Sequence, residues 1–425
     1  MRVVWAGSSL EDNLPAPRKI GRLFFLGIRL KFAEILKAYQ KSAKGKRRSL
    51  NCAGFESRLG FELSKLCEEV NNRTYRPGIS RCFAVLNPKP REIWAAEYRD
   101  RVIHHIIVSH VEPLYEPSFS KKSFACRRGM GHHACMIDFQ KQVRKISRGG
   151  RRTVWVLKLD VESFFVTIDR PILKNLMLKK VQCPEISWLI DLNFSIDPRL
   201  HFKYSGWREH LRKVPRNKSW LSYSDNQGIP IGNLTSQFGA NLYLSALDHF
   251  IERELKPKGF LRYMDDILVL ASSKEELFGI ENKVDSWLQK NRKQRLNREK
   301  TYLVPLTSGL EYLGFEVRQI FEPRNPLLIL PSKKKKFALV KDFRKLMDWN
   351  WNIMFFPHEL AFFDKTAHRT KLSSINSRLG MIKHTKSFNH RKTTVENFLR
   401  HQNEREVGRE LLMVKGDFHS LKYNG

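Results

Sequence analysis

The chain has 425 residues, which is enough for two to four subdomains that each have their own core. A hydrophobic content of 41% excludes a disordered protein. The 77 Lys and Arg residues against 43 Asp and Glu residues leave a formal net charge of +34. This excess goes beyond what solubility needs, so it predicts a polyanionic partner, either nucleic acid or an anionic membrane surface.

A membrane-spanning protein is disfavoured, because the chain contains no run of about 18 uncharged apolar residues. The most hydrophobic early stretch, IGRLFFLGIRLKFAEIL, is interrupted by Arg22, Arg29 and Lys31. The first residues lack the long apolar core of a signal peptide, and the cysteines show no CxxC pair or His-linked zinc spacing. We therefore expect a cytoplasmic protein with reduced thiols and no membrane partner.

Two helices are expected before residue 75. The first spans residues 28–39, and the second spans residues 57–71 with a clearer helical period. The apolar face of the second helix consists of Leu59, Leu63, Leu66, Cys67 and Val70. Both patterns indicate packing against a core.

The pattern changes from Tyr75 onward. Two short strands flank a proline-containing loop, and Lys89 and Arg91 lie at its turn. Residues 123–136, SFACRRGMGHHACM, then predict a glycine-rich turn that leads into a helix. His132 and His133 have no nearby acid or cysteine at ligand spacing, so hydrogen bonding at the helix start is favoured over metal binding.

Acidic residues end or interrupt two apolar, strand-like runs. The run that starts at Val154 ends on Asp160, and FLRYMDDILVL, residues 260–270, predicts a hairpin with Asp265 and Asp266 at its tip. Adjacent carboxylates among apolar neighbours resist joint ionisation unless a cation such as Mg²⁺ neutralises them. An exposed Asp-Asp turn is the alternative, but acids from two segments favour a two-metal site.

The other segments give coarser predictions. Phe164 and Phe165 are expected on opposite faces of a strand, and residues 183–226 are basic and predict mainly loop. A helix should begin near Ser236 with that serine as its N-cap, and another should span residues 274–290. GLEYLGFEV predicts a hairpin, and residues 332–425, which open on SKKKK, allow a small helical bundle.

YMDD together with LDVESFF resembles the palm signatures of reverse transcriptases, and the resemblance covers roughly residues 55–320. It implies an α+β right-hand polymerase fold with fingers, an antiparallel-sheet palm backed by helices, and a helical thumb. The implied activity is RNA-templated DNA synthesis. The implied domains are an N-terminal helical extension (1–55), fingers (56–150), a palm (151–325) with an insertion at about 183–226, and a basic helical thumb and tail (326–425).

The resemblance also implies catalytic roles. Asp160, Asp265 and the backbone carbonyl of Val161 would hold two Mg²⁺ ions, for which Mn²⁺ can substitute, and Asp266 would complete the acidic cluster. Lys300 would protonate the departing pyrophosphate. For this lysine, an ordinary surface position is the alternative interpretation.

Substrate contacts follow from the same resemblance. Contacts to the incoming nucleotide are expected from Lys89 and Arg91 on its triphosphate, from Phe165 as a barrier to a ribose 2′-hydroxyl, and from Ile231 and Gly232. Contacts to template or primer are expected from Arg127, Gln237, Tyr263, Met264 and Gly314. Solvated surface charges, and a core position for Phe165, are the alternatives.

One motif indicates a subgroup. Most reverse transcriptases carry QGxxxSP where this chain has IGNLTSQ, so that Ile231 replaces a glutamine and Gln237 replaces a proline. IGxxxSQ resembles the reverse transcriptases of diversity-generating retroelements. This implies that the chain copies a template-repeat RNA into cDNA with errors at adenines, using deoxynucleoside triphosphates, beside a small basic accessory variability protein. A group II intron-like or defence-associated reverse transcriptase, and a non-catalytic RNA-binding protein, remain open alternatives.

Overall fold

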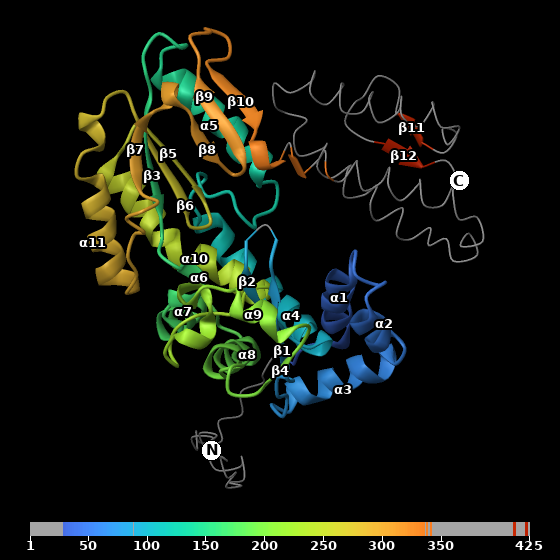
Figure 1. Ribbon diagram of the computed structural model, residues 1–425. Coiled ribbons are helices and arrows are strands. Elements are labelled where there is room, and N and C mark those ends of the chain that lie inside the picture. Colours follow the sequence, from blue (N-terminus) through green and yellow to red (C-terminus); the bar gives the residue numbers. More distant parts are fainter. Residues whose placement is uncertain are drawn as a thin grey trace, which may run out of the picture.

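An antiparallel sheet of four strands lies at the centre of the computed structural model (Figure 1). Its order is β5 (Gly259–Tyr263), β6 (Asp266–Ala271), β3 (Trp155–Asp160) and β7 (Tyr302–Pro305). All of its neighbouring strands pair antiparallel, so the fold is α+β. The structure describes residues 29–87, 89–335, 337, 338, 341, 411–413 and 421–423.

Side chains of the central sheet alternate between two cores, as the period of a strand requires. On one face, Leu157 and Ile267 share a core with α10 (Leu234–Phe250) and α11 (Ile280–Arg292). On the other face, Val156 and Leu268 pack with α5 (His132–Ile146) and with strands β8 to β10. Figure 1 shows α11 and α5 on opposite sides of the sheet. The sheet is therefore buried on both faces, and Asp160 and Asp266 lie at the ends of their strands.

A helical body lies below the central sheet in Figure 1. Its longest helix, α4 (Tyr98–Tyr115), contacts both α1 and α10. The other helices of this body are α1 (Phe32–Ala43), α2 (Leu50–Glu56), α3 (Leu59–Asn71), α7 (Arg170–Leu178) and α8 (Pro184–Ser195).

The predictions for the first helices are confirmed in kind and corrected in their limits. Helix α3 buries Leu63, Leu66 and Val70 on the expected face. Helix α1 begins at Phe32 and continues to Ala43, because this last turn is buried as well. The beginning of the predicted helix, at residue 28, lies outside the described residues.

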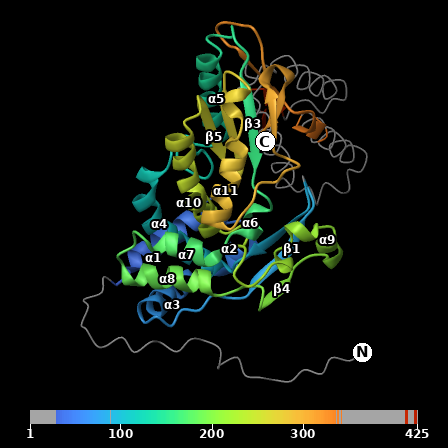
Figure 2. The same cartoon turned by 90° about the vertical axis from the view of Figure 1, so that its left-hand side faces the viewer.

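A second sheet joins distant parts of the chain. The predicted hairpin forms β1 (Ser80–Val85) and β2 (Arg91–Ala95), and β4 (Phe202–Tyr204) adds parallel to β1. Helix α9 (Arg208–Arg212) lies beside β1 in both views (Figure 1 and Figure 2). Residues 183–226 therefore contain α8 (Pro184–Ser195), β4 and α9 with loops between them, and the prediction of a loop-rich segment did not include the apolar helical spacing of α8. That spacing consists of Ile186, Leu189, Ile190 and Phe194.

Three further predictions of local structure are corrected. Phe164 and Phe165 lie on a short helix, α6 (Phe164–Thr167), which follows Ser163 in a left-handed conformation, so strand alternation does not apply. Helix α10 begins at Leu234, and Ser236 is buried inside its first turn instead of capping it. Helix α11 begins only at Ile280, after a separate 3₁₀ turn.

The predicted GLEYLGFEV hairpin is confirmed as β8 (Leu310–Tyr312) and β9 (Phe315–Gln319), and β10 (Leu327–Pro331) extends it. The helical bundle predicted beyond residue 332 lies mostly outside the described residues. In the described part of this region, β11 (Leu411–Met413) pairs with β12 (Leu421–Tyr423). Within the described part of the chain, no helix combines the length and the apolar character needed to cross a membrane.

A buried ion pair lies under the Asp265–Asp266 hairpin. Arg262 is fully buried, and its Nε and Nη2 atoms donate to the two carboxylate oxygens of Asp248 at 2.6 and 2.7 Å. Nη1 donates to the Met264 carbonyl at 3.0 Å, and Nη2 donates to Ser123 Oγ at 2.9 Å. Burial raises the pKa of Asp248, and Arg262 opposes this effect. One guanidinium thus joins β5, α10 and the segment before α5.

Replacing this arginine should destabilise the whole fold. We expect Arg262→Met to lower the free energy of unfolding by about 3–5 kcal/mol, because it leaves the Asp248 carboxylate buried without its cation. The control is Lys174→Ala, which breaks the largely exposed pair with Asp191 and should cost at most about 1 kcal/mol. Urea denaturation followed by circular dichroism measures both, and equal midpoints would contradict the assignment.

Candidate active site

The acidic cluster forms at one edge of the central sheet. Asp160 ends β3 and Asp266 begins β6, and the two residues are direct partners in the strand register. Side chains in such a pair have Cβ atoms about 4.5–5.5 Å apart. Asp265 lies in the turn between β5 and β6, beside Met264, whose φ is +55°. The structure therefore brings together the three carboxylates that the sequence selected.

Electrostatics at this edge favour a bound cation. Burial and then the charge of Asp266 raise the pKa of Asp265 to about 6. Burial also raises the pKa of Asp266, with Lys158 opposing at 4.0 Å and Asp160 adding to the increase. The ammonium of Lys300 lies 2.7 Å from Asp160 Oδ2. The carboxylates thus repel one another, and a divalent cation would relieve this repulsion.

The oxygen ligands at this edge suit Mg²⁺, which can complete its shell with water and substrate, better than they suit a metal that is bound by protein ligands alone. Among the described residues, no three His, Cys, Asp or Glu side chains are grouped closely enough to hold a metal. Mg²⁺ commonly takes one or two carboxylates and completes its shell with water and substrate phosphates. The backbone hydrogen bonds next to Val161 are made by the Asp160 carbonyl and the Glu162 amide. The Val161 carbonyl takes no part in them. Asp160, Asp265 and Val161 therefore offer oxygen ligands of the kind that a hard cation takes.

Basic residues of the second sheet reach the acidic edge. Lys89 and Arg91 are exposed at the tip of the β1–β2 hairpin. Lys89 lies close enough to Asp266 to oppose the increase in the pKa of that carboxyl. In the sequence, only the family resemblance related Lys89 and Arg91 to the acids. In the structure, the hairpin that carries both residues brings Lys89 near Asp266.

The turn before α10 connects the two sheets. The Ile231 carbonyl accepts a hydrogen bond from the Trp94 amide at 3.2 Å, and the Phe165 carbonyl accepts one from the Ile229 amide at 3.0 Å. Gly232 follows in the same turn. Phe165 is half-buried, whereas Phe164 is buried at 3% exposure. Phe165 and Ile231, both predicted to contact the nucleotide, are therefore joined through this turn.

Of the other residues predicted to contact template or primer, Gln237 lies apart from Tyr263 and Met264, which are neighbours at the end of β5. Gln237 lines a hollow of about 300 Å³ together with Lys41, His105 and Arg128. Tyr263 stacks on His132, with ring centroids 4.5 Å apart.

Met264 and Gly314 lie in hairpin turns. Gly314 has φ +75°, and a Cβ atom there would come within 2.5 Å of Lys335 Cε, so this turn requires glycine. Lys335, which was not singled out from the sequence, donates to the Leu313 carbonyl at 3.0 Å.

The position of Arg127 argues against the predicted template contact. Its side chain is 6% exposed, and its donors are used by Glu116 and by the backbone carbonyls of Ser120 and Ser123. A guanidinium with these partners stabilises the loop before α5 and has little capacity left for a nucleic acid.

Lys158, two residues before Asp160, belongs to the site although no motif in the sequence marked it. The period of a strand places residues i and i+2 on the same face, so this lysine points toward the acids. Lys218 was also missed, because residues 183–226 offered no motif. The residue after it, Ser219, donates a hydrogen bond to Glu92, which lies next to Arg91 on β2.

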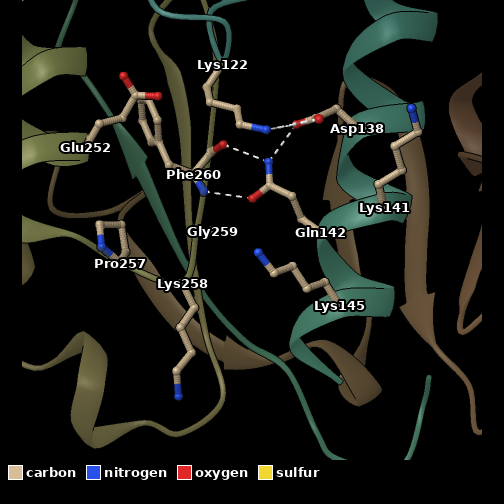
Figure 3. A pocket seen from close by; sticks show the side chains of 10 residues that line it. All are labelled: Lys122, Asp138, Lys141, Gln142, Lys145, Glu252, Pro257, Lys258, Gly259 and Phe260. Carbon is tan, nitrogen blue, oxygen red and sulfur yellow. Dashed lines mark hydrogen bonds and ion pairs between the residues drawn. The ribbon is translucent and has the colours of Figure 1, made fainter. Parts of the chain in front are cut away.

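A larger hollow of about 440 Å³ lies at the other end of β5, around Gly259 and Phe260 (Figure 3). Gln142 of α5 bonds both the amide and the carbonyl of Phe260, at 2.9 and 3.0 Å, and also bonds Asp138. Lys122 pairs with the same aspartate at 2.9 Å. These paired groups join α5 to the sheet, so we interpret this hollow as part of the scaffold.

Comparison with known families shows the family to which the chain belongs. Residues 87–317, more than half of the chain, match the family described as "Reverse transcriptase (RNA-dependent DNA polymerase)". The chain belongs to the reverse transcriptase family. The matched span contains every residue that the sequence had selected for the site.

Similar proteins include intron-encoded proteins. Protein YkfC of Escherichia coli is 22% identical over 62% of this chain and 73% of its own length. The group II intron-encoded protein LtrA of Lactococcus lactis is 21% identical over 66% of this chain and 54% of its own length. The putative COX1/OXI3 intron 2 protein of Saccharomyces cerevisiae is 19% identical, and the chain spans about a third of its length.

The raised pKa of Asp265 predicts a pH-dependent demand for metal. Below about pH 6 this carboxyl holds a proton, which a bound cation must displace. We expect the Mg²⁺ concentration for half-maximal primer extension to rise by about tenfold per pH unit below pH 6 and to level off above pH 7. Mg²⁺ titrations between pH 5 and 8 test this, and a constant half-saturation would contradict it.

Proposed function

We propose that this chain copies RNA into DNA at the edge formed by Asp160, Asp265 and Asp266. The observation that supports this function is the cross-strand pairing of Asp160 with Asp266 beside the buried, high-pKa Asp265. In a right-hand polymerase the central sheet is the palm, and the β1–β2 hairpin belongs to the fingers. Two Mg²⁺ ions, when bound, would lower the pKa of the primer 3′-hydroxyl and neutralise charge on the triphosphate and pyrophosphate.

The basic residues around the acids suit the remaining needs of the reaction. Lys89 and Arg91 hold the triphosphate, the lysine as a point charge and the arginine as a planar fork. Lys300, 2.7 Å from Asp160, is positioned to give a proton to the departing pyrophosphate. Phe165, five residues after Asp160 in the chain, has a half-buried ring whose volume would exclude a ribose 2′-hydroxyl.

We further propose that the chain serves a diversity-generating retroelement. The support is the string IGNLTSQ, which places Ile231 and Gln237 where most reverse transcriptases carry glutamine and proline. The template would then be a template-repeat RNA, copied with errors at adenines, and a small basic accessory variability protein would be a partner. A group II intron-like function is the second candidate, because the similar proteins include the intron-encoded LtrA.

Loss of one carboxylate should separate catalysis from binding. We expect Asp265→Asn to reduce primer extension on an RNA template by at least about a hundredfold, because metal-assisted charge stabilisation amounts to several kcal/mol. RNA affinity should stay nearly unchanged, since the basic surfaces are untouched. Asp191→Asn, at an exposed surface position, is the matched control.

Full synthesis by the Asp265→Asn variant in Mg²⁺ would overturn the site assignment. RNA binding by a wild-type protein that never extends a primer would favour the non-catalytic alternative.

The retroelement assignment is tested at Ile231. Its carbonyl is held by Trp94, so a side-chain change leaves this backbone bond in place. A glutamine adds a polar contact near the nascent base pair, worth about 1 kcal/mol, and this corresponds to roughly a five-fold change in selection. We expect Ile231→Gln to lower misincorporation opposite template adenines more than opposite other bases.

Sequencing of cDNA made on one template by wild type, by Ile231→Gln and by Leu200→Gln measures this spectrum. Leu200 is 83% exposed and serves as the control position. An active Ile231→Gln enzyme with an unchanged spectrum would count against the role.

A further inference from the structure

The segment around Lys218 is fixed to the β1–β2 hairpin through a buried carboxylate. Glu92, 3% exposed, lies next to Arg91 on β2. It accepts hydrogen bonds from Ser219 Oγ at 2.5 Å, from the Trp220 amide at 3.1 Å and from Trp94 Nε1 at 2.6 Å. A buried carboxylate needs such donors, because leaving it without them costs free energy. Glu92 therefore holds the residues that follow Lys218 against the strand that begins at Arg91.

A second anchor restricts the same segment. Trp220 is 1% exposed, and its ring packs edge-on against Trp94 with centroids 5.3 Å apart. Its Nε1 donates to the Gln227 carbonyl at 2.6 Å. A Cβ atom at Gly228 would collide with the indole, so only glycine fits beside this ring. The backbone two residues after Lys218 is consequently held on two sides.

This anchoring holds the backbone next to Lys218 beside the strand that begins at Arg91, and the Lys218 side chain is exposed there. Burial, and then the charges of Lys300, Lys89 and Arg91, lower the pKa of Lys218, whereas Asp160 raises it. Across the part of the chain that the structure describes, Lys218 has no ion-pair partner, and the tips of Lys89 and Arg91 have none either. Gathering like charges is unfavourable unless a polyanion neutralises them.

We propose that Lys218 binds the triphosphate of the incoming nucleotide. It is the cation that residues 183–226 add to the cluster of Lys89, Arg91 and Lys300, and Glu92 is the residue that positions it. This inference rests on the polymerase function proposed above. Phosphates of the template or primer backbone share the same chemistry, but the anchoring to Glu92, next to Arg91 on β2, favours the triphosphate.

The test compares Lys218→Ala, Lys218→Arg and a control, Lys213→Ala, which removes an exposed lysine of the same segment. Steady-state primer extension is measured against deoxynucleotide concentration at saturating primer-template. We expect Lys218→Ala to raise KM for the nucleotide about tenfold and to change kcat less than about twofold. This is the effect expected when one hydrogen bond to a charged group is lost from substrate binding. Lys218→Arg should restore most of the affinity, and the control should match wild type.

Positioning by Glu92 has its own readout. Ser219→Ala removes one donor to this carboxylate with little change in volume, and we expect it to raise KM about threefold in wild type. In the Lys218→Ala background the same change should have no further effect on KM, because the two residues act as a unit. Additive effects would show that Ser219 acts separately from Lys218 and would overturn the positioning role.

The outcomes distinguish this proposal from the polymerase proposal. If wild type extends primers and Lys218→Ala leaves KM unchanged, or weakens only primer-template binding, Lys218 is not a triphosphate ligand and the polymerase assignment stands. If wild type extends no primer, the polymerase proposal fails, and equilibrium binding of a fluorescent deoxynucleoside triphosphate decides the matter. Weaker binding by Lys218→Ala would then support the triphosphate contact, and equal binding would overturn it.

Discussion

The Arg262–Asp248 ion pair is the constraint on which the acidic edge depends. Both side chains are fully buried, and a guanidinium in that environment is tolerated only because its donors have acceptors. These acceptors come from α10, from the loop before α5 and from the carbonyl of Met264. Met264 has a positive φ, which is unfavourable for a side chain with a Cβ, and the bond to its carbonyl helps to hold the turn that carries Asp265.

The negative and positive charges of the candidate site come from different parts of the chain. The central sheet supplies the carboxylates, whose pKa values are raised by burial and by one another. The β1–β2 hairpin and the segment held by Glu92 supply Lys89, Arg91 and Lys218, which form no ion pair with any residue that the structure describes. Such an arrangement is unfavourable for the protein alone, and it matches a substrate with phosphates on one side and metal ions on the other.

Hydrogen bonds and ring contacts join the turn before α10 to the second sheet. The Trp94 amide bonds the Ile231 carbonyl, and Trp94 also packs on Trp220. The turn before α10, the β2 strand and the segment after Lys218 are therefore linked through one tryptophan. A substitution in any of these elements changes the surroundings of the others, although they are far apart in the sequence.

The sequence alone determined the strands that end on Asp160 and flank Asp265, the β1–β2 and β8–β9 hairpins and the face of α3, because these features depend on short-range periodicity and turn chemistry. It also supplied the motifs that identify the family. Only the tertiary structure decided that Arg127 is used by a loop, that Phe164 and Phe165 share a helical turn, and that Lys218 joins Lys89 and Arg91. Those outcomes depend on contacts between residues far apart in the chain, such as Ser219 with Glu92, which no local pattern encodes.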